Sequence, residues 1–159
     1  MPASKIDLLT HHEAGHAAVA YSFGLRLECV GIDTSTYDGF TTLAEGVQPT
    51  RLQHVLILLA GGRAETVLDH TSSSRSYAAA EDECRLQYIL EASFAHKLLR
   101  QSLDYCDRLT ERVDERLAGC CRRLVVLHWP AIQRLASELA TAHQIGGAYA
   151  EAILDNEGL

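Results

Sequence analysis

His12 and His16 stand four residues apart in the stretch HHEAGHA, and Glu13 follows directly after the first of them. Residues at positions i and i+4 of an α-helix lie on one face, so the two imidazoles can bind a single metal ion. Glu13 lies to the side of that face, where its carboxylate can take a proton from a metal-bound water. This spacing is typical of zinc hydrolases, in which the histidines hold the metal and the glutamate is the base.

The alternative interpretation is a helix that is merely rich in histidine. The three residues lie on the apolar side of the predicted helix, which also carries Leu9, Val19 and Phe23. Two imidazoles and a carboxylate buried there without partners would destabilise the fold, and this favours a metal site. Such a site needs a third protein ligand from another part of the chain.

Asp82 is the predicted third ligand. A helix is predicted over residues 78–100, and its buried stripe includes Leu86, Ile89 and Leu90. One turn before Leu86, the same stripe reaches Asp82, whereas the neighbouring acidic residues project to wetter sides of the helix. A carboxylate on an apolar face requires a cation nearby. The other candidates considered were His54, Asp69, His70, Glu81, Glu83, His96, His128 and His143.

The elements that would position these residues form a mainly α fold. We expect one helical domain over residues 1–159, with a small β-hairpin after the first, zinc-binding helix. Apolar residues at spacings of three and four predict that first helix over residues 6–23. Alternation from Leu25 predicts a strand to about Ile32, and FTTL returns as a second strand after a turn at Asp38-Gly39.

Beyond Pro49 the sequence predicts helices only. The first of them covers residues 50–68 and contains VLILLA, which is apolar on every side and is therefore expected in the core. The helix over residues 78–100 precedes a long helix that closes at HWP, and Pro130 begins the next one. The glycines of IGG, at residues 145–147, are predicted to break that helix before a short final one.

Composition excludes several classes of partner. The net charge of −7 argues against nucleic-acid binding, which requires a basic surface. The longest apolar run, residues 55–60, is far shorter than the roughly 20 residues that cross a bilayer, so no membrane insertion is expected. The five cysteines are odd in number and lack C-x-x-C spacing. This pattern suits reduced thiols and predicts a cytoplasmic location.

Four motifs together resemble a known family. HEAGHA, LLAGGRAE, AAAEDE and HWPAIQRLASEL, in this order, resemble the peptidase domain of FtsH-type ATP-dependent zinc metalloproteases, over about residues 8–155. The resemblance implies a mainly helical fold and a Zn2+ ion held by His12, His16 and Asp82, with Glu13 as the catalytic base. Glu65, in the second motif, is left open between a role in supporting the site and a place on the helix surface.

The family also suggests a place for the substrate. In FtsH-type peptidases the hairpin exposes a strand edge, which corresponds to about residues 26–43 here, and an extended peptide can pair with such an edge. The alternative is a hairpin that merely caps the core. The chain differs from the family in lacking a G-x-x-x-x-G-K-[ST] phosphate-binding loop. It also differs around Asp82, where the family has asparagine before the aspartate and alanine-threonine after it.

Two functions follow from this sequence. The first is a zinc-dependent endopeptidase that hydrolyses peptide bonds in flexible or unfolded polypeptides through a Glu-activated water, with a separate ATPase or unfoldase as partner for folded substrates. The second is a zinc-stabilised, catalytically silent protein-binding module that has kept the peptidase fold. Neither the identity of the substrate nor the oligomeric state is predicted.

Overall fold

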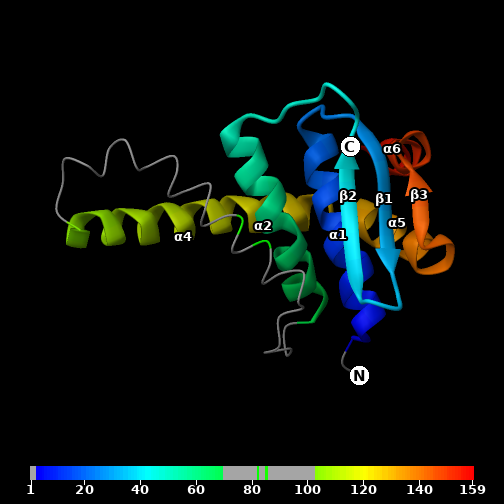
Figure 1. Cartoon of the computed structure of the whole chain (residues 1–159), viewed down its shortest axis with the longest axis horizontal. Helices are drawn as coiled ribbons and strands as arrows, with labels where there is room; N and C mark the ends of the chain where they lie inside the picture. The colour runs from blue at the N-terminus through cyan, green and yellow to red at the C-terminus, as the bar shows by residue number, and fades with distance from the viewer. Residues whose placement is uncertain (1–2, 70–81, 83–84, 86–102) are drawn as a thin grey trace.

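The computed structural model of the chain describes residues 3–69, 82, 85 and 103–159, with the backbone alone for residues 103–114. The described part is mainly helical with a small antiparallel sheet, as the sequence predicts. Except for Asp82 and Arg85, the helix predicted over residues 78–100 lies outside the described residues. The elements, in chain order, are α1 (Lys5–Ser22), β1 (Leu27–Asp33), β2 (Asp38–Leu43), α2 (Arg51–Leu68), α4 (Leu103–Leu127), α5 (Trp129–Ala142), β3 (Gln144–Gly146) and α6 (Gly147–Asn156) (Figure 1).

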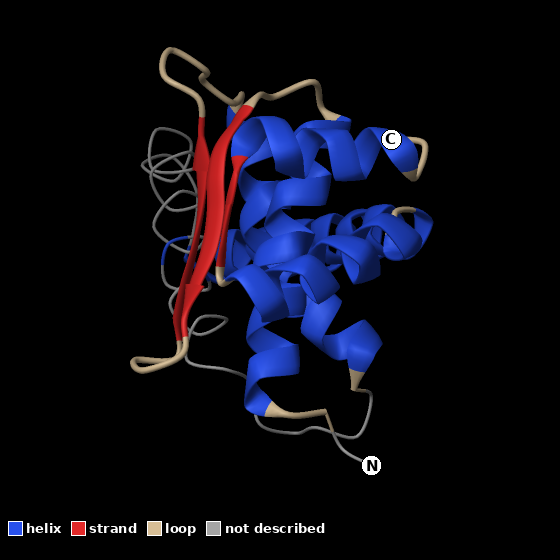
Figure 2. Cartoon of the chain, turned by 90° about the vertical axis from the view of Figure 1, so that its right-hand side faces the viewer, coloured by secondary structure: helices blue, strands red, loops and turns tan. Residues whose placement is uncertain are grey.

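The sheet has three strands in the order β2-β1-β3, and both pairs are antiparallel. The helices lie along one face of this sheet, which is seen edge-on in Figure 2. Val30, in the central strand, is fully buried and lies opposite Thr41 of β2 and Ile145 of β3. The predicted break at residues 145–147 is confirmed, because α5 ends at Ala142 and α6 begins at Gly147, but the sequence did not predict that strand β3 lies within this break.

The hairpin turn lies at residues 34–37, and not at Asp38-Gly39 as the sequence suggested. The Asp33 carboxylate accepts hydrogen bonds from the backbone N–H and the hydroxyl of Ser35, at 2.8 and 2.6 Å. Tyr37 completes the turn with a φ of 56°. An Asp that bonds to the residue two positions on is a recognised turn-former, so Asp33 was the better signal. Asp38 and Gly39 begin β2 instead.

Helix α1 lies in the interior and contacts α2, α5, β1 and β2. It packs tightly against α2 at Gly15. A Cβ atom on Gly15 would lie 2.9 Å from both the Ala60 carbonyl oxygen and the Ala64 Cβ, so only glycine lets the two helices come this close. Since Gly15 lies between the two motif histidines, this packing brings α2 directly against the candidate metal ligands.

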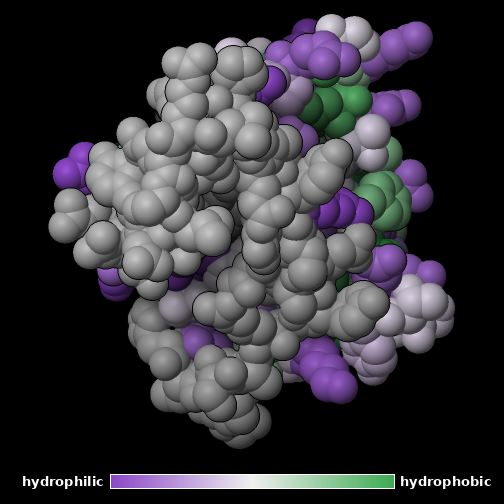
Figure 3. Space-filling model, turned by 60° about the vertical axis from the view of Figure 1, so that its left-hand side comes forward, coloured by the Kyte–Doolittle hydropathy of each residue, from purple (hydrophilic) through white to green (hydrophobic). Residues whose placement is uncertain are grey.

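The surface of the described part is mixed. On the face shown in Figure 3, the visible described side chains are mostly hydrophilic, and the hydrophobic ones appear in small separate groups. Among the helices of the described part, none is long and apolar enough to cross a bilayer.

Candidate metal centre

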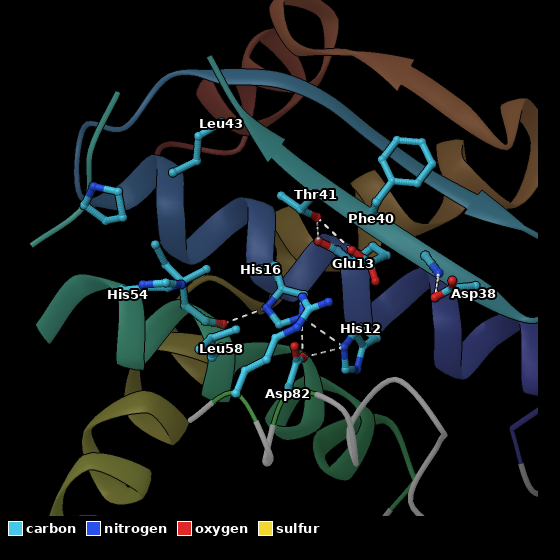
Figure 4. Close-up of a pocket in the computed structure, with 14 residues that line it drawn as sticks. His12, Glu13, His16, Asp38, Phe40, Thr41, Leu43, His54, Leu58 and Asp82 are labelled. Atoms are coloured by element: carbon cyan, nitrogen blue, oxygen red, sulfur yellow. Dashed lines mark hydrogen bonds and ion pairs between the residues drawn. The ribbon is translucent and has the colours of Figure 1, made fainter. Parts of the chain in front are cut away.

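The structure brings His12, His16 and Asp82 together. The Nε2 atoms of His12 and His16 lie 2.9 Å apart. The Asp82 Oδ2 atom lies 3.0 Å from Nε2 of His12 and 2.9 Å from Nε2 of His16 (Figure 4). Asp82 is in helical conformation and 8% exposed, whereas Arg85 on the same turn is exposed. Asp82 therefore faces inward, as the helical projection of the sequence predicts.

These three residues fit a zinc ion. Two imidazole nitrogens and one carboxylate oxygen are ligands that zinc accepts, as do other divalent transition metals. Tetrahedral bonds of about 2.0–2.1 Å place neighbouring ligand atoms roughly 3.4 Å apart, so a small outward movement of the side chains would accommodate the ion. Helix α2 leaves space at this point. A Cβ atom on Gly61 would lie 2.5 Å from Nε2 of His12 and 2.6 Å from Nε2 of His16.

The second nitrogen of each imidazole is also bonded. Nδ1 of His12 donates to the Glu65 carboxylate at 2.6 Å, and Nδ1 of His16 donates to the Ile57 carbonyl oxygen at 2.6 Å. Because Nδ1 of each ring is bonded to an acceptor in α2, Nε2 is the atom that faces Asp82, as a donor when the ring is protonated or as a metal ligand when it is neutral. Helix α2 supplies both acceptors and so orients both histidines.

Two carboxylates flank His12 and favour a positive charge there. Burial lowers the pKa of His12, but the hydrogen bonds to Asp82 and Glu65 outweigh burial and raise the pKa to about 10. Burial acts to raise the pKa of Asp82, but hydrogen bonds from His12 and His16 hold it well below the usual range. The surroundings of the cluster therefore favour a cation, whether a proton or a metal ion.

Glu65 supports the site and does not lie on the helix surface, which answers the question that the sequence left open. Its side chain is buried, and its Oε1 atom lies 2.6 Å from Nδ1 of His12. A usable signal was present in the sequence. Gly61 and Glu65 are four residues apart and therefore lie on the same face of α2. A glycine on that face allows another helix to pack closely against it, and the Glu65 carboxylate then lies at the same interface.

Replacing Glu65 by Gln should weaken zinc binding. The amide can still accept a hydrogen bond from His12, but it lacks the negative charge that increases the basicity of the ring. Loss of such a partner typically costs 10- to 100-fold in metal affinity, so we expect at least a tenfold weaker affinity in competition with a chelator. The exposed Glu45→Gln is the matched control. Equal affinities for both variants would rule out this role.

The other described candidates lie elsewhere. His54 lines the cleft but is exposed, and Asp69 accepts a hydrogen bond from the Ala3 backbone N–H at 3.3 Å. His128 and His143 occupy the two ends of α5. Within the described ranges, His12, His16 and Asp82 are the group that could hold a metal ion. The candidates outside those ranges are His70, Glu81, Glu83 and His96.

Glu13 lies beside the three ligands with a bond of its own. Its side chain is buried, and Oε2 accepts a hydrogen bond from the Thr41 hydroxyl of β2 at 2.9 Å. The carboxylate and the ligand cluster line one cleft of about 330 Å³ between α1, α2 and β2 (Figure 4). The sequence predicted Glu13 but not Thr41, because a contact between a helix and a strand 28 positions later depends on tertiary packing.

No protein-family model matches the chain, and no curated protein matches it either.

Proposed function

We propose that this chain is a zinc-dependent endopeptidase. The observation that carries the proposal is the position of Glu13, a buried carboxylate in the same cleft as His12, His16 and Asp82. A structural zinc site usually has four protein ligands, whereas a catalytic site has three and one open position. The described residues provide three ligands and a neighbouring base. The resemblance of four motifs to FtsH-type peptidases supports the same function.

Each residue has a distinct role in this proposal. Bound Zn2+ would polarise the scissile carbonyl group and acidify a water molecule in the cleft. Glu13 takes the proton from the attacking water and then delivers it to the leaving amine. His12, His16 and Asp82 would hold the metal, while Glu65 orients His12 and would balance the charge.

The cleft suits an extended polypeptide. Strand β2 is an edge of the described sheet, and its residues Gly39, Thr41 and Leu43 line the cleft. A peptide that pairs with this edge would pass Glu13, and backbone hydrogen bonds would tolerate many sequences. Such a peptide has to be extended, so the substrates we propose are flexible or unfolded chains. A separate ATPase would be needed to open folded ones.

The proposed location is the cytoplasm. It rests on the cysteines, of which Cys29, Cys120 and Cys121 are free thiols among the described residues. Free thiols of this kind are typical of a reducing compartment.

Zinc content and casein cleavage test this function together. Protein purified without chelator should contain about one zinc per chain and should cleave casein. Chelation should abolish cleavage and lower the melting temperature, because the metal links α1 to the segment of Asp82, and added zinc should restore both. A folded, metal-free protein that ignores added zinc would contradict the proposal. A zinc-loaded protein that cleaves nothing, even with an unfoldase present, would instead support the binding module.

A further inference from the structure

Strand β2 holds the carboxylate of Glu13 through two residues on the face that meets α1. Thr41 donates a hydrogen bond to Oε2 at 2.9 Å, and its hydroxyl also lies 3.1 Å from the Glu13 carbonyl oxygen. The hydroxyl has only one proton to donate. The carbonyl is inside α1 and has a helical partner, whereas a carboxylate oxygen is the stronger acceptor. The bond to Oε2 is therefore the dominant one.

Gly39 supplies the second contact. A Cβ atom at this position would lie 2.5 Å from Oε1 of Glu13 and 2.6 Å from its Cγ atom. The Glu13 side chain thus lies flat against the backbone of β2. Gly39 and Thr41 are two positions apart, and alternate residues of a strand share one face. One residue fixes Oε2 and the other leaves room for Oε1, so that the strand sets both the position and the rotation of the carboxylate.

From these contacts we infer that Thr41 and Gly39 are positioning residues for the base of the proposed peptidase. The inference rests on the proposed function for its catalytic consequence. A free glutamate side chain samples several rotamers, and ordering it has an entropic cost that a preformed bond removes from the reaction. Within the described residues, Oε1 has no hydrogen-bond donor, so it is the oxygen available to take the proton.

The same strand borders the cleft and would also receive the substrate. A peptide that pairs with the edge of β2 would therefore be aligned by the element that holds the base. A displacement of β2 would therefore move the Glu13 carboxylate and the paired peptide together.

Thr41→Val tests the inference because valine keeps the shape of threonine and lacks the hydroxyl. We expect the kcat for a flexible fluorogenic peptide to fall about 10- to 100-fold, with KM and zinc content unchanged. Thr41→Ser restores the donor and should recover kcat to within about threefold of wild type. Thr42→Val is the matched control, because Thr42 is exposed on the opposite face of the same strand.

Gly39→Ala is a second and independent variant. Its new methyl group should displace the Glu13 carboxylate and lower kcat while zinc is retained. Gly146→Ala is the matched control, because a Cβ atom at Gly146 meets nothing within 4 Å. If Thr41→Val and Gly39→Ala both keep kcat within about twofold of wild type, the inference is overturned. The inference would also be overturned if Thr41→Ser did not recover kcat and if the loss of kcat among the Thr41 variants simply paralleled the loss of melting temperature.

A measurement without turnover separates this inference from the proposed function. The ¹³C resonance of the Glu13 carboxyl group, assigned by its absence in Glu13→Gln, should shift in Thr41→Val and stay in place in Thr42→Val. This shift is expected in protein with and without zinc, at constant pH. An inactive wild-type protein that shows the shift would refute the peptidase and leave the contact established. An unchanged resonance would refute the contact whatever the activity.

Discussion

Glu13→Gln is expected to leave the protein folded and loaded with zinc while peptidase activity falls about 10²- to 10⁴-fold. Glutamine keeps the shape of the side chain, and its amide oxygen can still accept the hydrogen bond from Thr41. It cannot take a proton from the attacking water, so the general-base contribution is lost. Activity on casein, zinc content and melting temperature should be measured on the same preparation.

The control for this variant is Glu45→Gln, which makes the same chemical change at an exposed position. It should match wild type in all three measurements. A residual Glu13→Gln rate within about threefold of wild type would show that Glu13 is not the base. A parallel loss of zinc would show that the carboxylate acts on the metal site itself.

Gly61→Ala is expected to remove zinc binding almost entirely, and activity with it. The new Cβ atom would lie within 2.6 Å of Nε2 on both His12 and His16, the two atoms that would bind the proposed metal. These imidazoles are held from behind by Glu65 and Ile57, so they cannot move away without breaking those bonds. We expect zinc to fall well below 0.1 equivalents after dialysis, measured by elemental analysis, which follows from a loss of two or more ligands.

Helix propensity separates this loss from general unfolding. Ala is favoured over Gly in a helix by about 1 kcal/mol, so the substitution does not weaken α2 by itself. Gly119→Ala in α4 is the control, because a Cβ atom there meets nothing within 4 Å. Circular dichroism should show folded helices in both variants. One full equivalent of zinc in Gly61→Ala would exclude the proposed ligand geometry.

The candidate ligands could be predicted from the sequence because the helical period determines on which side of its helix each side chain lies. His12 and His16 share a helix face by spacing alone, and Asp82 followed from the apolar stripe of one helix. The helices around residues 6–23 and 50–68 were close to α1 and α2 for the same reason. In each case, the prediction depends only on the spacing of residues within a single helix.

Features that depend on distant segments could not be predicted in this way. Ile145 belongs to a strand because it lies opposite Val30, a partner far away in sequence. Thr41 and Gly39 became meaningful only once β2 was placed against α1. The Asp38-Gly39 pair is a common turn sequence, yet its glycine is required for the close approach of Glu13 and not for a change of direction.

The pairing of β1 with β3 has a consequence for how the molecule folds. Gly31 lies opposite Gln144, more than one hundred positions later, whereas β1 and β2 are joined by a short turn. Pairing of distant segments is slow, because the entropy of the intervening loop is lost before the contacts form. During synthesis, the hairpin can form early, whereas β3 leaves the ribosome more than one hundred residues after β1. Among the described strands, the sheet that carries the support for Glu13 therefore gains β3 well after its hairpin has formed.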